Sequence, residues 1–442
     1  MRKFSLVRLV AARPGHQVVA VQADSVNPDK RFVPAWDGGG NLRIFEHFRT
    51  TILIVCRRLH CPGNHSPAAF LVSALLDPER ASCPSAYFCI LIYTILGINC
   101  RAAILAGHIL STRAGMRKTW SHGMHLEKAR SYSDLRERLS RRDRGLSEKV
   151  MSLEDASALI TDGQSVGIGG SMMSRTPMAM IWQLIRSGRK NLVCSRSITT
   201  SEGDLLLGSG LSNHIITSWF SQGIMWGISK VMRMHVESGQ ARYDEWSHLA
   251  IGMRFRAGAM GVPFMPMRPM LGSDVLASRP EARVINCPFT SENILLVPAL
   301  NPDVAIIHVH SCDPYGNARI EGLQFMDIDL AMAADKVILT TERIISNDQI
   351  RRAPDQTKIP FFCVDGVVEV PFGSAPHECY GVYEPMMNHL DSYVRKVNSD
   401  PIGGMKSYLD EHIYAPRSWN DYLNLIGLEE VLGAAHRGRS ND

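Results

Sequence analysis

Clustered glycines directly after a short apolar run are the residues of this sequence best placed for chemistry. Residues 165–168 are typical of a buried strand, and Gly167, Gly169 and Gly170 leave the backbone bare at its carboxyl end, with Ser171 next. Ligands bind at the carboxyl ends of strands in open α/β sheets. Uncovered N–H groups there can hold an anion or a developing oxyanion. The sequence therefore predicts a ligand-binding turn, with the alternative that the glycines only permit a tight turn.

The glycine pattern does not fit either common nucleotide-binding loop. If Gly167 and Gly169 opened a dinucleotide fingerprint, Met172 would stand where the third glycine belongs. Residues 187–190, about 20 positions further on, contain no acidic side chain for the ribose. A phosphate-binding P-loop is also excluded, because no Gly-Lys-Ser/Thr follows the turn.

The elements that would position this turn alternate between helix and strand. Ser152 is a good N-cap for a short helix that Gly163 ends, and the glycine strand follows. Further strands are predicted at 191–195, 215–218, 304–310 and 336–341, and helices at 177–185, 247–259 and 326–334. This rhythm is typical of an α/β domain with a mainly parallel sheet and helices on both faces. We predict this domain over residues 151–410, after a charged helical lead-in at 116–150 and before a C-terminal tail at 411–442.

Residues 1–115 form a leader without a clear fold, because they show no sustained helical or strand period. We expect a wrongly assigned start, with Met116, Met124 or Met151 as the true first residue, and a genuine extra domain is the alternative. The formal net charge is +5, but the excess of Lys and Arg is concentrated in the first 150 residues, so it does not indicate nucleic-acid binding. Residues 86–110 approach membrane-span length with Arg101 near the centre, and we expect no membrane segment there.

Ten cysteines are scattered without a CxxC pair or a Cys/His ligand spacing. Neither a zinc site nor a disulfide framework is indicated, and we expect reduced thiols in a cytoplasmic protein. His308 and His310 would share one face of a strand, but no third ligand stands at a suitable spacing, so we expect no metal. The methionines at 260, 265, 267 and 270 suit an adaptable apolar pocket or an interface.

Several separate motifs resemble one family in order. They are residues 149–156 (KVMSLEDA), 166–170 (VGIGG), 254–264 (RFRAGAMGVPF), 269–274 (PMLGSD), 297–308 (VPALNPDVAIIH), 313–317 (DPYGN), 364–373 (VDGVVEVPFG) and 380–383 (YGVY). This set resembles the A (alpha) subunit of family I coenzyme A transferases, and the alpha subunit of glutaconate CoA-transferase is the nearest label. The resemblance covers about residues 151–408.

The resemblance implies a heteromeric enzyme in which A and B subunits of the same fold meet around one active site. In this family a glutamate attacks an acyl-CoA thioester, passes through an anhydride, becomes a glutamyl-CoA thioester and hands CoA to an acceptor carboxylic acid. In two-subunit members that glutamate belongs to the B subunit. No bound cofactor is implied, because the CoA thioester is a substrate.

The A chain should then supply surfaces around the thioester. We expect Gly169 and Gly170 to offer N–H groups near the thioester oxygen. A second loop facing substrate or CoA is expected from the run Pro269, Met270, Leu271, Gly272 and Ser273. Arg254 and Arg256 are candidates for clamping a phosphate or carboxylate, although their spacing places them on different helix faces, so at most one would reach a ligand.

Three glutamates of this chain are candidate nucleophiles. Glu292 lies in Ser-Glu-Asn, which resembles the B-subunit sequence, but Ile294 replaces the glycine and we expect a surface turn. Glu202 follows a predicted strand and so lies near strand ends. We expect it to be a solvated loop carboxylate.

Glu245 supports a second hypothesis. An acidic residue at this place resembles one that ring-cleaving CoA hydrolases use, so Glu245 could activate water to open a cyclic β-diketone on CoA. Asp244 and Glu245 could equally be the N-cap and first turn of the following helix. The hydrolases carry Trp-Gly after their glycines, whereas this chain has Ser171-Met172-Met173, which favours the transferase. A third hypothesis is a sugar-phosphate-binding regulator or isomerase of the same fold. The regulator form would need an N-terminal helix-turn-helix, which we do not find.

Overall fold

The computed structural model describes residues 35–37, 41–43, 130–143, 145–223 and 225–439. The chain divides into two units, Met1–Thr119 and Trp120–Asp442. In the first, β1 (Ala35–Asp37) and β2 (Asn41–Arg43) pair antiparallel. The rest of the leader and the apolar run at 86–110 lie outside the described residues. Within the described part of the chain, no helix is long and apolar enough to cross a membrane.

The second unit is built on a nine-stranded sheet in the part of the chain that is described. Seven of the strands are parallel, in the spatial order β6-β5-β4-β3-β10-β12-β14. They are β3 (Ser165–Ile168), β4 (Leu192–Ser195), β5 (Ser212–Thr217), β6 (Arg242–Glu245), β10 (Val304–Cys312), β12 (Lys336–Ile344) and β14 (Gly366–Glu369). Successive strands are added on one side of β3, toward β6, and on the opposite side of β10, toward β14. The switch point, where such sheets bind ligands, therefore lies between β3 and β10.

Two short antiparallel strands extend the sheet beyond the end of β3. These strands, β11 (Ala318–Arg319) and β13 (Thr357–Ile359), follow β10 in the order β10-β11-β13. β11 pairs with Ser311 and Cys312 at the carboxyl end of β10. β10 can be central because all nine of its residues are buried, as expected for a parallel strand covered on both faces.

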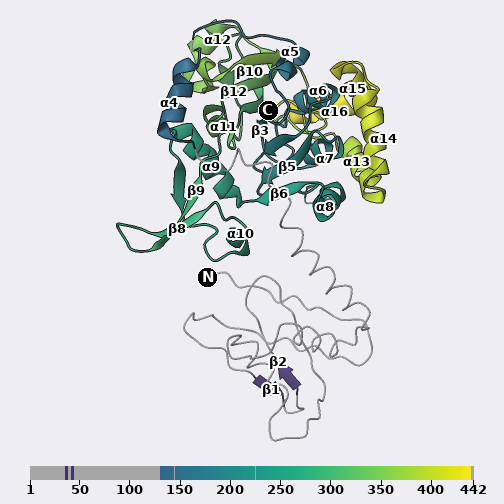
Figure 1. The fold of residues 1–442 in the computed structure, drawn as a ribbon. Coiled ribbons are helices and arrows are strands. Elements are labelled where there is room, and N and C mark those ends of the chain that lie inside the picture. Colours follow the sequence, from purple (N-terminus) through teal and green to yellow (C-terminus); the bar gives the residue numbers. More distant parts are fainter. Residues whose placement is uncertain (1–34, 38–40, 44–129, 144, 224, 440–442) are drawn as a thin grey trace, which may run out of the picture. The chain divides into compact units, whose positions relative to one another are not determined.

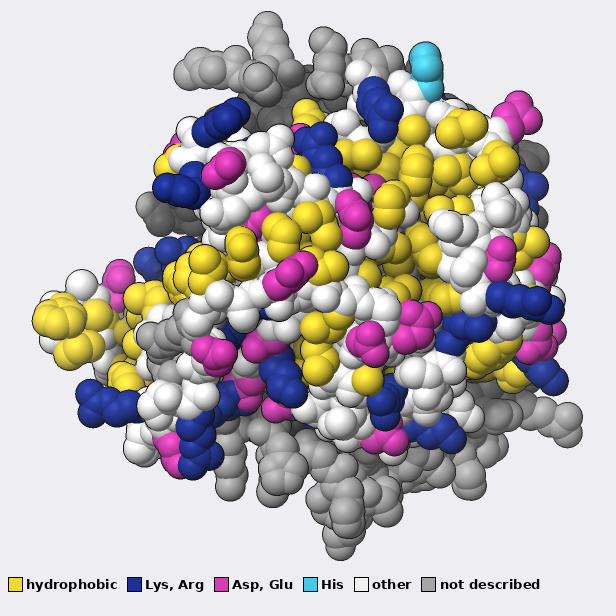
Figure 2. All heavy atoms as spheres, turned by 90° about the horizontal axis from the view of Figure 1, so that it is seen from above, with side chains coloured by type: hydrophobic (Ala, Val, Ile, Leu, Met, Phe, Trp, Pro, Cys, Tyr) yellow, Lys and Arg dark blue, Asp and Glu magenta, His cyan; other side chains and the backbone are white. Residues whose placement is uncertain are grey.

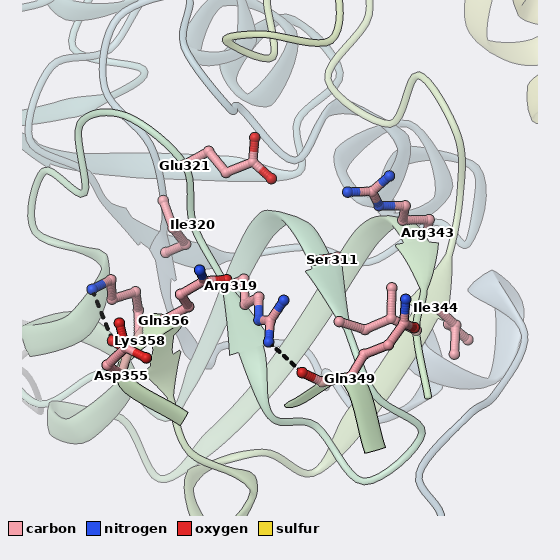
Figure 3. Close-up of a pocket in the computed structure, with 11 residues that line it drawn as sticks. Ser311, Arg319, Ile320, Glu321, Arg343, Ile344, Gln349, Asp355, Gln356 and Lys358 are labelled. Atoms are coloured by element: carbon pink, nitrogen blue, oxygen red, sulfur yellow. Dashed lines mark hydrogen bonds between the residues drawn. The ribbon is translucent and has the colours of Figure 1, made fainter. Parts of the chain in front are cut away.

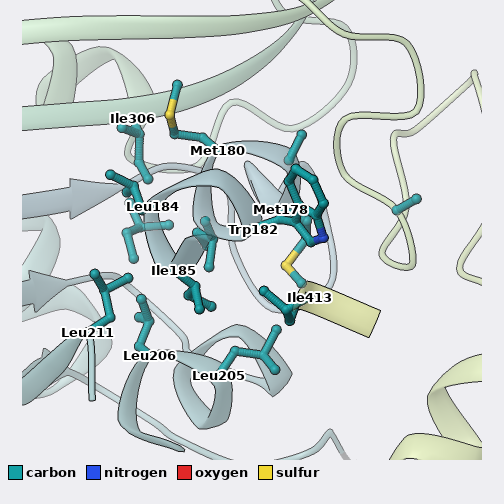
Figure 4. Close-up of a cluster of buried hydrophobic side chains, with 14 of the residues drawn as sticks. Met178, Met180, Trp182, Leu184, Ile185, Leu205, Leu206, Leu211, Ile306 and Ile413 are labelled. Atoms are coloured by element: carbon teal, nitrogen blue, oxygen red, sulfur yellow. The ribbon is translucent and has the colours of Figure 1, made fainter. Parts of the chain in front are cut away.

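Two hydrophobic cores cover the two faces of the sheet. Side chains alternate along β10, so Val304 and Ile306 belong to one core and Ala305, Ile307 and Val309 to the other. The first core receives α5 (Leu153–Ala158), α6 (Met178–Arg186) and α7 (Ser201–Gly208), and Figure 4 shows the apolar side chains of α6 and α7 side by side. The second receives α9 (His248–Met260) and α11 (Asp327–Ala333), which pack against each other.

A small antiparallel sheet projects from this body (Figure 1). Its strands are β7 (Phe264–Met267), β8 (Arg283–Asn286) and β9 (Asn293–Pro298), in the order β7-β9-β8, with α10 (Asp274–Ala277) between β7 and β8. Hydrophobic side chains gather at the projecting end in Figure 2. Phe289, in the turn between β8 and β9, is 93% exposed.

Residues 411–439, most of the predicted C-terminal tail, form packed helices. The C-terminal elements are α13 (Met387–Ser399), α14 (Gly403–Tyr408), the π-helix η5 (Leu409–Tyr414), α15 (Trp419–Ile426) and α16 (Leu428–Arg439). Trp182 of α6 donates to the carbonyl of His412 at 3.0 Å. Trp419 packs edge-on against Trp182, so this segment closes the first core.

The remaining elements are short. They are α4 (Tyr132–Arg141), α8 (Lys230–Glu237), α12 (Asn347–Arg352) and the 3₁₀ turns η3 (Pro354–Gln356) and η4 (Phe361–Cys363). The predicted α/β fold is confirmed, including the N-cap at Ser152, whose side chain accepts from Asp155. The charged lead-in is helical only over α4 among its described residues.

Candidate functional site

The glycine turn leaves β3 at the switch point. Gly170 has a φ of +70°, and a Cβ there would lie 2.2 Å from the carbonyl oxygen of Ser174. Only glycine fits this position, because a side chain would both strain the backbone and strike it. Gly167 instead lies within β3, where a Cβ would meet Leu330 at 2.4 Å. Its role is close packing of α11 on the strand.

The amides of Gly169 and Gly170 have partners within the protein, which corrects the expectation that they face a ligand. The Gly169 N–H donates to the carbonyl of Ile306 at 2.9 Å, because the backbone still follows the sheet. The Gly170 N–H donates to Asp327 Oδ1 at 2.7 Å. These two N–H groups stabilise the turn through hydrogen bonds within the protein and are not free to bind an oxyanion.

A buried ion pair holds the turn from the β10 side. Arg175, at the end of the turn, is fully buried and pairs with Asp327 at the start of α11. Its guanidinium also donates to the carbonyls of His308 at 3.2 Å and Leu323 at 2.8 Å. One arginine therefore joins the glycine turn, β10 and the loop after β11.

A second buried ion pair holds the turn from the β4 side. Arg196, directly after β4, pairs with Glu202 in the first turn of α7, and both side chains are almost wholly buried. Arg196 Nε donates to the Gly169 carbonyl at 3.2 Å. Thr200 donates to Glu202 through its amide at 2.9 Å and its hydroxyl at 2.7 Å. The contacts that Arg196 and Thr200 make to the carboxylate all favour an ionised Glu202.

Glu202 is thus neither solvated nor available for attack, and the expectation of a solvated loop carboxylate is wrong. Burial alone would raise the pKa of Glu202, but the charge of Arg196 and the Thr200 donors outweigh it, and the pKa lies below its ordinary value. The role of this carboxylate is structural, because it holds Arg196 and the start of α7 in place.

A hydrogen-bonded chain continues from Arg196 to a buried histidine. Arg196 donates to Thr176 Oγ1 at 2.8 Å, Thr176 bonds His377 Nδ1 at 2.7 Å, and His377 Nε2 bonds the Ser201 hydroxyl at 2.7 Å. Burial lowers the pKa of His377 to about 4. The imidazole is therefore neutral at physiological pH and links the glycine turn to the loop after β14.

A row of hydroxyl groups follows the carboxyl ends of β3, β4 and β5. The Ser197 hydroxyl donates to Ser171 Oγ at 3.1 Å, and the Thr199 hydroxyl donates to Thr217 Oγ1 at 3.1 Å. The four side chains of this row are buried, and the loop after β5 exposes the apolar side chains of Trp219, Met225 and Ile228. Hydroxyls and an apolar rim together suit a ligand with a carboxylate or thioester head and a carbon chain.

Apart from Ser171, this row was not predicted from the sequence. The signal was present, because 197-SITTS-201 lies just after the predicted strand 191–195 and Thr217-Ser218 end the predicted strand 215–218. Ligands gather at such ends, so the hydroxyls could have been found by applying the strand-end rule to β4 and β5.

Glu245 and Glu292 lie away from the glycine turn. Glu245 is exposed at the carboxyl end of the edge strand β6, and Ser247, not Asp244 or Glu245, caps α9. Asp244 is buried and pairs with His214 at 2.8 Å and Arg279 at 2.8 Å. Glu292 is exposed in the turn between β8 and β9, as expected.

Neither arginine of the 254–264 motif is placed as an anion clamp. Arg254 is 2% exposed, stacks over Trp246 with its guanidinium carbon 4.1 Å from the ring centroid, and donates to the Pro298 carbonyl at 3.1 Å. The Arg256 side chain is exposed beside Asp329 at 3.7 Å. Pro269, Leu271, Gly272 and Ser273 lie in a surface loop between β7 and α10, and Met270 is buried beneath it.

The two strand histidines serve hydrogen bonding. His308 bonds Thr340 at 2.9 Å and Glu342 at 2.7 Å, and His310 bonds the Tyr380 carbonyl at 2.8 Å. Ligand atoms of His308, Glu342 and Cys379 lie within 4.8 Å of one another. Residues that could bind a metal therefore do lie beside His308, although their spacing in the sequence did not reveal them.

This cluster does not fit a metal ion. The Glu342 carboxylate already accepts from Tyr383 at 2.6 Å and from the amides of Phe372 and Gly373. Burial raises the pKa of the Cys379 thiol well above its ordinary value, which opposes the thiolate that a metal requires. The methionines are divided, with Met267 and Met270 buried and Met260 exposed.

Comparison with known proteins places these features in context. The family model for coenzyme A transferase matches residues 150–370. A protein of Archaeoglobus fulgidus is 36% identical over 298 residues, which are 67% of this chain and 66% of that protein. The A subunit of glutaconate CoA-transferase from Acidaminococcus fermentans is 32% identical over 304 residues, covering 64% of this chain and 93% of the relative.

A solved structure and part of a hydrolase match as well. The crystal structure of glutaconate coenzyme A-transferase from Acidaminococcus fermentans aligns with a TM-score of 0.62 and 31% identity, over 65% of this chain and 95% of that one. The cholesterol ring-cleaving hydrolase IpdA subunit of Rhodococcus jostii is 29% identical over 257 residues, covering 55% of this chain and 86% of the relative.

Proposed function

The chain belongs to the coenzyme A transferase family, and we propose that it is the A subunit of a heteromer that moves CoA between carboxylic acids by way of a glutamate on a B subunit. Relatives named as the A subunits of glutaconate and 3-oxoadipate CoA-transferases support transfer between acids and a second subunit. In the proposed complex, CoA thioester and free acid are the substrates and no bound cofactor takes part.

We assign the nucleophile to the partner subunit because Glu202 of this chain is buried and ion-paired. Of the three candidate glutamates, only Glu202 lies beside the glycine turn, and it is 0% exposed and paired with Arg196. A carboxylate must be accessible and free to change partners if it is to attack a thioester. An A chain with a buried structural glutamate at this place therefore requires a carboxylate from another chain.

The proposed reaction proceeds in balanced exchanges at that glutamate. Its carboxylate attacks the thioester carbonyl and CoA leaves as thiolate; the thiolate then attacks the glutamyl carbonyl of the anhydride and releases the first acid. The acceptor carboxylate reverses these steps and takes up CoA. This chain would bind the reacting groups at the hydroxyl row around Ser171 and Ser197, where each well-placed donor to an oxyanion contributes about 3 kcal/mol.

Co-expression tests the proposal. The full-length chain would be purified with the B-type subunit of the same organism, and a panel of acyl-CoAs assayed with and without an acceptor acid. We expect CoA transfer only with the acceptor, lost on mutating the partner's glutamate and retained in Glu245→Ala. Acceptor-independent release of CoA that Glu245→Ala abolishes would contradict the transferase.

That second outcome defines the alternative function, a CoA hydrolase. Its supporting observations are the exposed carboxylate of Glu245 at the end of β6 and the similarity to a ring-cleaving hydrolase subunit. We favour the cytoplasm as location, because Cys194, Cys312 and Cys379 are buried thiols, as is usual in reducing compartments.

A further inference from the structure

Two hollows of the second unit differ in their relation to the glycine turn. One, of about 470 Å³, opens beyond the carboxyl ends of β10 and β12, where Figure 3 shows the side chains that line it. Because the glycine turn lies at the same end of the parallel strands, this hollow belongs to the same ligand-binding edge. The other, of about 770 Å³, is a groove between the start of α13 and helix α16, with Met387, Ile426 and Gly433 in its walls. This groove lies outside residues 150–370, which match the family model.

Helix α16 exposes leucines beside the groove. Leu428 and Leu432 are neighbours on the helix surface, four residues apart, and are 58% and 62% exposed. Leu425, at the end of α15, is 46% exposed. The core-facing side of α16 is formed by other residues, among them Val431 and Ala434. Surface helices usually carry polar side chains away from their core-facing side, so this apolar flank indicates a contact with another surface.

Gly433 also indicates a partner outside the chain. Among the described residues, a Cβ at this position would come within 4 Å of Arg437 Nη1 alone, at 3.4 Å, which is the end of a flexible side chain. Gly438 differs, because a Cβ there would lie 2.6 Å from the backbone of Tyr383. Glycine destabilises a helix interior relative to alanine. It also allows a second backbone to approach closely, and at Gly433 that backbone does not come from the described part of this chain.

The charges of α16 identify the kind of partner. Glu429 lies in the first turn of the helix, and His436 and Arg439 lie in the last. This order suits the helix dipole, and it also suits an antiparallel copy of the same helix, whose basic end would meet the acidic end. Glu429 and His436 are equally far from the midpoint between Leu432 and Gly433. A twofold axis at that midpoint would therefore place Leu432 opposite Gly433, and Glu429 opposite His436, of a second copy.

We propose that α16 forms a homodimer interface in which it packs antiparallel against α16 of a second copy of this chain. Leu432 of each copy enters the groove of the other beside Gly433, where Met387 and Ile426 supply apolar walls. The glycine lets the two helix axes come to about 8 Å, the short end of the usual range. The exposed leucines, the glycine and the charge order are then all explained by one contact. The interface concerns the assembly of this chain and does not depend on CoA transfer.

Sedimentation of the full-length chain alone tests the interface, and we expect a dimer. Leu432→Lys should raise the Kd of the dimer about a hundredfold, because each dimer loses two buried leucines. Leu249→Lys is the matched control, because Leu249 is an exposed leucine on α9, outside α16 and the groove. Gly433→Leu should raise the Kd about tenfold or more without lowering the melting temperature, because leucine favours the helix but fills the contact.

Charge variants test the antiparallel register. Glu429→Arg and His436→Glu should each raise the Kd about five- to tenfold, because each places like charges opposite one another twice per dimer. Mixed in equal amounts, the two variants should associate as tightly as wild type. In the mixed antiparallel pair, each introduced charge faces an opposite or complementary one.

Several results would overturn the interface. They are a chain that stays monomeric at its highest soluble concentration, a dimer that Leu432→Lys weakens no more than Leu249→Lys, and an unchanged Kd in Gly433→Leu. Charge variants that associate no better when mixed would also overturn it. A monomeric chain whose binding to a B-type subunit is abolished by Leu432→Lys would assign the flank to that subunit and overturn the second copy. None of these measurements uses CoA, so failure of the proposed function would leave them unaffected.

Discussion

Arg196 links the glycine turn to Glu202, since its Nε donates to the carbonyl of Gly169 while its Nη1 is paired with the Glu202 carboxylate. The glycine turn is thus held by a carboxylate 33 positions away in sequence from Gly169, although neither residue needs to touch a ligand. Together with Arg175 and Asp327 on the other side, this arrangement makes the turn rigid before any ligand binds.

Glu202→Gln should destabilise the fold strongly. The substitution leaves the Arg196 charge buried without a counter-ion, which costs about 3–5 kcal/mol. Unfolding in urea at neutral pH would measure the loss. Glu245→Gln is the control, because that side chain is exposed and should change stability by less than about 0.5 kcal/mol. Equal stability of the two variants would show that the ion pair does not hold the turn.

Gly170→Ala should be far more damaging than another glycine replacement at positive φ. Gly163 has a φ of +78° with nothing within 4 Å of a Cβ, whereas a Cβ on Gly170 meets backbone at 2.2 Å. Gly163→Ala should therefore cost only about 1–2 kcal/mol of conformational strain. Gly170→Ala adds a clash that must move the turn. Thermal unfolding compares the two, and matching melting temperatures would contradict the geometry.

Regular elements were predictable because each carries a local pattern. Residues 165–168 form β3 with both ends as predicted, since an apolar run lies between Gly163 and clustered glycines. The start of α9 was less certain, because Asp244 and Glu245 compete with Ser247 as helix starters. The structure resolves this through β5, whose register with β6 pairs Thr217 with Glu245 and keeps both acids in a strand.

Burial of charges was not predictable from local patterns. Glu202 follows Arg196 by six residues, a spacing without helical or strand periodicity, so nothing in the sequence pairs them. Asp327 and Arg175 are separated by 152 residues. From the sequence we therefore predicted a solvated Glu202 and glycine amides that face a ligand. Both predictions were wrong because the true partners are not local in the sequence.

Acid should destabilise the protein through two buried histidines. Burial lowers the pKa of His377 to about 4 and of His389 to about 3, against about 6.5 for the unfolded chain. The unfolded state therefore binds more protons below that pH. Stability is fully present above it and falls toward pH 4, by up to about 1.4 kcal/mol per pH unit for each histidine.

Urea unfolding between about pH 7.5 and 4.5 measures this slope. His389→Gln should reduce it by about one proton, since the remaining His377 still titrates. The overall stability of the variant is not the readout, because His389 also bonds Tyr408 at 2.9 Å. A slope identical to wild type would mean that His389 is not held neutral by its surroundings.

Removing single serine hydroxyls should distinguish a residue that binds the reacting groups from one that only supports the fold. Ser197 is buried beside the glycine turn, where its hydroxyl donates to Ser171 Oγ. In the proposed function this hydroxyl turns from Ser171 to the reacting carbonyl or carboxylate when the ligand binds, and Ser197→Ala should lower kcat/KM by about 10²-fold. The Ser209 hydroxyl donates to the carbonyls of Leu205 and Leu206 within its own helix end, and Ser209→Ala should leave kcat/KM within about twofold. Both variants should unfold within about 1–2 kcal/mol of wild type, since each loses the hydrogen bonds of one hydroxyl group. Equal activity of the two would move the reacting groups away from the ends of β3 and β4, because a hydroxyl that touches them cannot be removed without cost.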